Sequence, residues 1–385
     1  MKKRVVIAGL GDTGLLIAVS LSKEFDVVGI TPKPGMVSGQ DVGGRLAWSE
    51  SWKKSNLIYF HQYKRLDNVR IVRGFVTSIN AEKSLVTIRL LDGTEYVEPY
   101  HVLVISSGVQ NGFWRTNNAD SFPVIEAKID SISQQVATAQ TVAVIGGGAT
   151  GVSVANNLAE RYQDKSIHLF YGRDHLLPDY HPKVQSQIRT HLLKLNVHLH
   201  PNHRAKVPDG FMCDRVTSEP VEWEMGQSSF HADVVIWAVG RVSPNNTFIS
   251  PDMLDNNGFV RVESTLQVSG YDNVFAVGDI AASDIHRSSA RNDGHEIVTH
   301  NIRTVLSGTV SKMKKYKPSS YRWGEILGVQ KTGLRVFTSN GMSVWFSKRV
   351  VNWFLFPIVV RRFIYKGIRT KEQAFALKQK HNDLH

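Results

Sequence analysis

The feature that most constrains this chain is a glycine-rich turn that occurs twice. Residues 4–16 read RVVIAGLGDTGLL, and residues 141–154 read TVAVIGGGATGVSV. In each copy a short run of Val, Ile and Ala precedes the glycines and an apolar run follows them, which predicts a buried strand that turns sharply into a helix. Both copies have the spacing G-x-G-x-x-G, formed by Gly9, Gly11 and Gly14 and by Gly146, Gly148 and Gly151.

Each glycine of this spacing has its own task. The first permits a tight turn, the second lets the backbone approach a pyrophosphate, and the third lets the helix pack on the strand. The phosphates then lie at the helix N-terminus, where free N–H groups and the helix dipole favour negative charge. A single copy can be a strand-to-helix turn without a ligand. Two copies, each between a strand and a helix, predict two dinucleotide sites.

The composition fits an enzyme-sized globular protein. With 385 residues, of which 42% are hydrophobic, the chain can bury the cores of two or three domains. Its one cysteine, Cys213, excludes a disulfide framework, a C-x-x-C redox pair and a cysteine zinc site. The opening MKKRVVIAGLG is similar to a signal peptide, but its apolar run is the first predicted strand and no small-residue cleavage site follows it. We expect a cytoplasmic protein.

Further buried strands follow the first turn. Residues 70–79 and 85–97 alternate apolar and polar side chains around Asp92-Gly93, which predicts an antiparallel insertion with a hairpin turn. Three apolar runs at 100–108, 233–245 and 273–281 each contain a strand that ends in glycine, at Gly108, Gly240 and Gly278. The pattern predicts an α/β fold.

In this order the stretches resemble the FAD/NAD(P)H oxidoreductases with two dinucleotide-binding domains, most closely the type II NADH:quinone oxidoreductases and the apoptosis-inducing-factor-like quinone reductases. GLGDTG is similar to the FAD turn, GGGATG to the NAD(P)H turn, VISSG and WAVGR to the family's strand ends, and FAVGD to its second FAD motif. The resemblance covers about residues 4–305. It implies two Rossmann-like domains, with FAD bound by residues 1–115 and 245–305 and NAD(P)H by residues 116–244, followed by a small α+β domain at 306–385.

The resemblance also implies which residues hold FAD. Asp279 would bond the ribityl chain, although Gly-Asp after a strand also caps helices. The backbone N–H of Thr13 would meet the pyrophosphate, and main-chain groups at Val76 would hold the adenine. The helix after Asp279 would point its N-terminus at the flavin. Candidates near the flavin or pyrophosphate are Ser289, Ala290, Arg291 and Arg45, of which the arginines could instead be solvated charges; the strand ends add Ser107, Gly108, Gly240 and Gly278.

Two positions depart from the usual fingerprint, in which an acidic residue about twenty residues after the glycines bonds a ribose. The first copy has Thr31, followed by Lys33, and a hydroxyl can still bond a ribose. The second copy has Tyr171, with Arg173 two residues later. Losing the carboxylate removes a group that repels a 2′-phosphate, and Arg173 could clamp that phosphate or be an ordinary surface arginine. We expect NADPH to be used at least as well as NADH.

Other residues limit the chemistry. Quinone-reducing relatives often have glutamates where this chain has Ser153 and Asn157, so their mechanism does not transfer directly. Disulfide reductase chemistry is excluded because it requires a dithiol. Hydride transfer from nicotinamide to flavin needs stacked rings in a dry site, and we assign no catalytic residue. His198 and His200 share a strand face without acidic or cysteine partners, so we expect no metal site.

The basic surplus lies entirely in the tail. Residues 306–385 hold 16 Lys and Arg against 3 Asp and Glu, whereas the first 305 residues hold 30 and 31. Residues 321–346 predict a β-hairpin that turns at Asn340-Gly341. Residues 347–369 contain six basic residues, no acid and five aromatic residues, in an apolar run too short to span a bilayer. A helix from Pro357 would place apolar side chains on one side and cations on the other, as in an interfacial anchor.

These observations leave several partners open. The favoured acceptor is a quinone at an anionic membrane surface, with the protein peripheral on the inner face of the cell membrane. One alternative is a soluble reductase of a small redox protein, and another is a redox sensor that binds nucleic acid through the tail. The apolar side at 350–364 suits a phosphate backbone poorly, so we do not favour nucleic acid. That side could also pack on the protein itself or on a second subunit in a homodimer.

Overall fold

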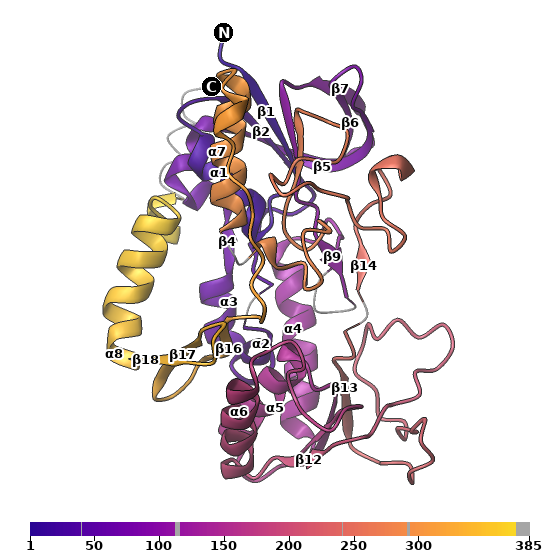
Figure 1. The fold of residues 1–385 in the computed structure, drawn as a ribbon. Coiled ribbons are helices and arrows are strands. Elements are labelled where there is room, and N and C mark those ends of the chain that lie inside the picture. The colour runs from indigo at the N-terminus through magenta and orange to yellow at the C-terminus, as the bar shows by residue number, and fades with distance from the viewer. Residues whose placement is uncertain (40, 112–115, 241, 291–292, 375–385) are drawn as a thin grey trace.

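The computed structural model describes residues 1–39, 41–111, 116–240, 242–290 and 293–374. Figure 1 shows two α/β units, one above the other, with the C-terminal segment along one side. The α/β architecture, with two sheets built around parallel strands, confirms the predicted fold class. The boundaries of the four segments predicted from the sequence stay predictions.

The upper unit is built on a seven-stranded sheet with the order β15-β8-β1-β2-β5-β6-β7. Its parallel strands are β15 (Val274–Ala276), β8 (Val102–Ile105), β1 (Arg4–Ala8), β2 (Asp26–Thr31) and the first half of β5 (Val69–Asn80). The second half of β5 pairs antiparallel with β6 (Leu85–Leu90), which pairs with β7 (Glu95–Pro99) across the turn at Asp92-Gly93. The predicted insertion and hairpin are therefore confirmed.

Helices cover the large sheet on one face. The helices α1 (Asp12–Leu21) and α7 (Gly294–Leu306) pack side by side, and Leu15 and Val298 join the strand residues Val5 and Ile7 in one buried core. The strand that precedes α7 is β15, some 170 residues after β8, yet the two strands pair directly. Two distant parts of the chain thus build one sheet, because a parallel neighbour must come from a crossover connection.

The lower unit has a four-stranded parallel sheet with the order β12-β11-β10-β13. These strands are β12 (His198–His200), β11 (Ser166–Phe170), β10 (Thr141–Ile145) and β13 (Val234–Trp237). The helices of this unit are α4 (Phe122–Thr138), α5 (Ala149–Arg161) and α6 (Pro182–Lys194). The short strands β9 (Val109–Gln110) and β14 (Ser243–Pro244) pair antiparallel, and the two chain passages between the units therefore run side by side.

Four smaller elements lie between β2 and β5 in the chain. The hairpin of β3 (Gly35–Val37) and β4 (Leu57–Tyr59) encloses α2 (Val42–Ala47) and α3 (Ser49–Asn56). The contact of α2 with α5 is so close that a Cβ on Gly43 would collide with the backbone carbonyl of Ser153. Short 3-10 turns lie at Phe60–Gln62, Lys64–Asn68, Pro251–Met253, Ser288–Ala290 and Val310–Lys312.

The C-terminal segment forms a three-stranded antiparallel sheet of β16 (Gly324–Val329), β17 (Gly333–Phe337) and β18 (Ser343–Ser347). The predicted hairpin with its turn at Asn340-Gly341 is formed by β17 and β18, and β16 adds a third strand that was not predicted. A bulge between Glu325 and Val329 breaks the alternation in β16, which hid this strand in the sequence pattern.

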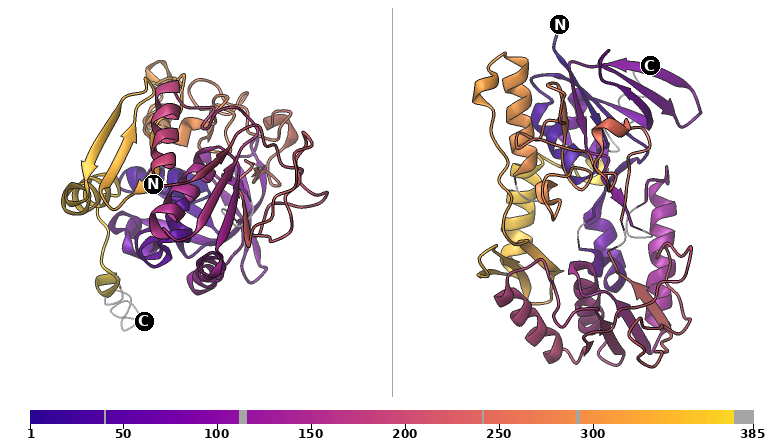
Figure 2. Two further views of the ribbon diagram at one scale, coloured as in Figure 1. Left: turned by 90° about the horizontal axis from the view of Figure 1, so that it is seen from below. Right: turned by 45° about the vertical axis from the view of Figure 1, so that its right-hand side comes forward.

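A helix follows β18 from Lys348 to Ile364, with π-type turns from Val351 onward. The predicted start at Pro357 is wrong, since Ser347 Oγ accepts a hydrogen bond from the N–H of Val350 (3.3 Å) and caps the helix nine residues earlier. Figures 1 and 2 show this helix at the outer edge of the molecule. Its end returns to the upper unit, where the rings of Tyr365 and Tyr63 pack edge to face.

Buried amides join α5 to the C-terminal sheet. Asn157 Nδ2 donates to the carbonyls of Ser153 and Leu327, each at 2.8 Å, and Asn156 Nδ2 donates to Gln330 Oε1 at 2.7 Å. These amides are buried, so each unmade hydrogen bond would carry a desolvation cost. Asn157, which stands where quinone-reducing relatives often have a glutamate, thus holds the C-terminal sheet against the lower unit.

We predict that Asn157→Ala destabilises the protein by about 1–3 kcal/mol, because the Leu327 carbonyl loses a buried donor. Chemical denaturation followed by tryptophan fluorescence measures the effect. The control is Gln135→Ala on α4, whose exposed amide bonds only within its own helix; it should change stability by less than about 0.5 kcal/mol. Equal effects of the two variants would show that the Asn157 amide does not hold the interface.

Candidate functional site

The two glycine turns have the same geometry. Gly9 and Gly146 have φ angles of +107° and +130°, which favour glycine, and a Cβ on Gly9 would lie 2.6 Å from the Ser106 carbonyl oxygen. A Cβ on Gly14 would collide with the carbonyl of Gly9, and one on Gly151 with that of Gly146. The first and third glycines therefore serve the turn and the close packing of helix on strand.

The middle glycines differ from the others. Gly11 and Gly148 directly precede α1 and α5, have ordinary negative φ angles, and face open space, since a Cβ on either would meet no atom within 4 Å. Neither helix has a side-chain cap at its start. Each turn thus presents free backbone N–H groups to a space that a phosphate can enter.

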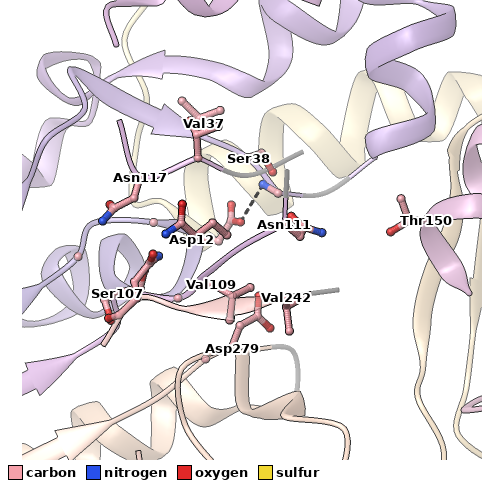
Figure 3. Close-up of a pocket in the computed structure, with 18 of the residues that line it drawn as sticks. Asp12, Val37, Ser38, Ser107, Val109, Asn111, Asn117, Thr150, Val242 and Asp279 are labelled. Atoms are coloured by element: carbon pink, nitrogen blue, oxygen red, sulfur yellow. Dashed lines mark hydrogen bonds between the residues drawn. The ribbon is translucent and has the colours of Figure 1, made fainter. Parts of the chain in front are cut away.

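Both turns open into one cleft between the units, with a volume of about 1500 Å³. This exceeds the roughly 300–1,000 Å³ of a pocket for one small ligand and fits two dinucleotides that meet end to end. Most of the predicted site residues line it: Gly9, Gly11, Thr13, Thr31, Lys33, Arg45, Val76, Ser107, Gly108, Gly148, Gly240, Gly278 and Asp279. Figure 3 shows Asp279, Ser107 and Asp12 on one side of the cleft and Thr150 of the lower unit facing them.

The other predicted residues lie elsewhere. Gly14, Gly146 and Gly151 lie beneath the helices, as their packing requires. Tyr171 is buried in the core of the lower unit behind Gly147, where burial raises the pKa of its hydroxyl, and Arg173 is exposed two residues later. Ser289 is buried and its hydroxyl bonds the N–H of Gly278 (3.0 Å). Ala290 ends a 3-10 turn, and Arg291 lies outside the described residues.

Thr31 and Arg45 are both held in place. Thr31 ends β2, and its hydroxyl accepts a hydrogen bond from the N–H of Lys33 (3.3 Å). Arg45 is only 4% exposed, so its interpretation as a solvated charge is wrong. Its guanidinium lies over the ring of Trp52 (4.4 Å to the centroid) and donates to the carbonyl of Ser38 (3.3 Å).

Asp12 and Asn245 are among the cleft residues that the sequence did not predict. Asp12, inside the first glycine turn, accepts a hydrogen bond from the N–H of Gly39 (3.1 Å; dashed line in Figure 3) and so fixes the segment after β3. Asn245 exchanges hydrogen bonds with Ser107, each 2.8 Å long, and locks the two chain passages together. The acid at a variable position of G-x-G-x-x-G was the only signal for Asp12, and Asn245 had none.

The histidines form a stacked cluster on the lower sheet. His168 Nδ1 lies 3.0 Å from His200 Nε2, and the ring of His168 stacks on those of His198 and His200. Burial, with the neighbouring His198 and His200, lowers the pKa of His168 to about 4, so the ring is neutral at pH 7. Among the described residues no group of three or more His, Cys, Asp or Glu could hold a metal.

We predict that Gly11→Val abolishes FAD binding while the protein still folds, because the new side chain points into the cleft. Gly148→Val should retain FAD and raise the KM for the nicotinamide donor at least about tenfold, the equivalent of about 1.4 kcal/mol. Flavin absorbance, circular dichroism and steady-state kinetics measure these effects. Gly14→Val is the control that should fail to fold. FAD retained by Gly11→Val would place the cofactor elsewhere.

Comparisons with known proteins agree with this geometry. The apoptosis-inducing factor homolog B of Dictyostelium discoideum is 25% identical over 83% of this chain and 85% of its own length. The ferroptosis suppressor protein 1 of Xenopus tropicalis is 26% identical over 82% and 84%. The solved sulfide:quinone oxidoreductase of Aquifex aeolicus shares the fold, with a TM-score of 0.66 and 16% identity over 91% of this chain and 88% of that one.

The model of the pyridine nucleotide-disulphide oxidoreductase family matches residues 3–304, which contain both glycine turns and every predicted cofactor residue. The open turns, their helix N-termini and the cleft between them fit two bound dinucleotides. With one cysteine, the chain cannot form within itself the disulphide that the family's name mentions. The chain therefore belongs to the pyridine nucleotide-disulphide oxidoreductase family and is an FAD-dependent NAD(P)H oxidoreductase.

Proposed function

We propose that this enzyme passes electrons from NAD(P)H to a quinone at an anionic membrane surface. The observation that carries the proposal is the outer helix at 348–364, which we call the docking helix. Its Trp353 is 81% exposed, and Phe354, Phe356 and Phe363 on the same helix are exposed as well. Soluble monomers rarely expose a large contiguous apolar patch unless it binds something.

The docking helix also carries the charge for such a surface. Lys348, Arg349, Arg361 and Arg362 lie on it, and it contains no acidic residue. The neighbouring strand β18 adds Val344 and Trp345, each about half exposed. Basic and aromatic side chains together are typical of helices that lie in the membrane interface, where each cation contributes about 1 kcal/mol. None of the described helices is long and apolar enough to cross a bilayer.

The cleft offers a place for a quinone ring. Its wall includes Trp323 and Ile326 at the start of the C-terminal sheet, and Leu177 and Pro178 of the lower unit. FAD held at the first glycine turn and Asp279 would supply the redox chemistry between the nicotinamide and the acceptor. The residues of the chain position the two dinucleotides and exclude water. The Aquifex relative in fold is named for a quinone acceptor, which agrees with this choice.

We predict that Trp353→Glu/Phe363→Glu lowers binding to anionic vesicles at least about tenfold, because two aromatic side chains leave the interface and two acids enter it. Turnover should fall in parallel for a long-chain quinone dissolved in the vesicles. It should be unchanged for a water-soluble quinone, which reaches the cleft directly. Vesicle cosedimentation and NAD(P)H oxidation measure both effects, with Met225→Glu on the lower unit as the control.

Three outcomes would contradict the proposal. If the wild-type protein reduces no quinone, the proposed acceptor is wrong. If it reduces a ferredoxin instead, a soluble reductase of a small redox protein is favoured. If the wild-type protein does not bind anionic vesicles at low salt, the proposed docking on a membrane surface is wrong. A dimer that the double variant converts to a monomer would show that the docking helix covers a second subunit.

The donor preference has its own test. Tyr171 lies behind Gly147 of the second glycine turn, and Arg173 is exposed two residues later, which supports a contact of Arg173 with a 2′-phosphate. A charge-assisted hydrogen bond contributes about 1.5–3 kcal/mol, so Arg173→Ala should lower kcat/KM for NADPH roughly 10- to 150-fold and leave NADH nearly unchanged. Stopped-flow reduction of the bound flavin by each donor measures this. Equal losses with both donors would give Arg173 a general role, and a wild-type preference for NADH would refute the assignment.

A further inference from the structure

Reducing a quinone takes two protons as well as two electrons, and the cleft holds a carboxyl pair that the cofactor sites do not use. We propose that Asp41, paired with Glu325, is the acid that donates a proton to the acceptor's oxygen in the cleft. This inference rests on the proposed quinone reductase function.

Asp41 occupies a special position at the start of α2. Its backbone is left-handed (φ +48°, ψ +48°), and its side chain accepts a hydrogen bond from the N–H of Gly44 (3.3 Å). Asp41 lines the cleft together with Arg45 and Ser153. α2 packs against α5 at Gly43 and Ser153, and Asp41 lines the same cleft as Gly148 of the second dinucleotide turn.

Glu325 reaches the same place from the C-terminal sheet. Its Oε2 accepts a hydrogen bond from the N–H of Gly328 (2.8 Å), and Glu325 also lines the cleft. A Cβ on Gly328 would collide with Oδ1 of Asp41. The bulge in β16 therefore places a glycine where only a glycine leaves room for the Asp41 carboxyl, and both carboxyls approach this one residue.

The surroundings keep a proton on Asp41 near neutral pH. Burial and the charge of Glu325 raise the pKa of Asp41 to about 7, against the lowering effects of the Gly44 N–H and the Arg45 guanidinium. The adjacent part of α5 contributes the uncharged Ser153. A carboxyl with a pKa near the working pH can both release and regain a proton, which is the property that acid catalysis requires.

The proton balance is complete without another reactant. NAD(P)H supplies the two electrons and one proton equivalent, and the acceptor's two carbonyl oxygens become hydroxyls. At one of them the O–H bond of the Asp41 carboxyl breaks and a new O–H bond forms, which leaves the electron pair on the carboxylate. Water returns a proton to Asp41. The net reaction consumes NAD(P)H, one proton and the quinone, and yields NAD(P)+ and the hydroquinone.

The decisive variant is Asp41→Asn, whose amide oxygen can still accept from Gly44. We expect its reduction of a water-soluble quinone to fall roughly 100-fold, within the range for loss of a general acid. Flavin reduction by NAD(P)H and turnover with ferricyanide should be unchanged, because ferricyanide takes up an electron and no proton. In wild type, quinone turnover should fall as the pH rises through about 7.

A second readout needs no turnover. A folded-state pKa above the ordinary 3.8 means that ionising Asp41 destabilises the fold, so wild type should lose stability relative to Asp41→Asn as the pH rises from about 4 to about 7. The melting temperatures of both proteins measured across this range reveal the difference. Glu325→Gln can still accept the hydrogen bond from Gly328, and it should shift the pH dependence of quinone turnover and of the melting difference to lower pH. Asp92→Asn in the exposed hairpin should shift neither of them.

The outcomes separate the two proposals. Wild type that reduces no quinone refutes the proposed function. Wild type that reduces quinone as fast as Asp41→Asn, or a melting difference that does not change with pH, refutes the role of Asp41 and leaves the function intact. An equal loss with quinone and ferricyanide would show that Asp41 serves the structure of the cleft and donates no proton.

Discussion

The contact between α2 and α5 is the constraint on which the rest of the structure depends. Gly43 lies against Ser153, so α2 meets α5 of the lower unit with no side chain at position 43 between them. This close approach fixes the distance between the two glycine turns, each of which can bind a dinucleotide from its own side. A larger residue at position 43 would widen the cleft and separate two rings that must stack for hydride transfer.

The C-terminal sheet packs against α5 and α2 and stabilises this arrangement. It contacts α5 through Asn157 and Gln330 and approaches α2 through Glu325 and Gly328. The same small sheet thus joins the two units, closes one side of the cleft and carries the docking helix. In this architecture the surface that would meet a membrane and Glu325, the partner of the proposed acid Asp41, both belong to the C-terminal segment.

Much of the architecture follows from local sequence. The glycine spacing with its preceding apolar strands predicts both sheets, because a βα turn that holds a phosphate needs backbone without side chains at fixed positions. Gly11 and Gly148 have that open geometry, and the packing of Gly14 and Gly151 follows from the same spacing. The sequence also indicated the basic and aromatic character of the docking helix, because a segment rich in basic and aromatic residues and without acids is recognisable from composition alone. The structure shows that these aromatic residues are exposed.

Tertiary contacts decided the rest. The bulge in β16 has no signature in hydrophobic alternation, and the helix start at Ser347 depends on a cap that competes with the signal of Pro357. The burial of Arg45 over Trp52 could not be foreseen, because a lone arginine looks the same whether it is solvated or stacked. The pairing of Asp41 with Glu325, 284 residues apart, is of the same kind. Sequence determined the elements and the two dinucleotide turns, whose requirements are local, whereas the cleft and its charges arose only when distant segments packed together.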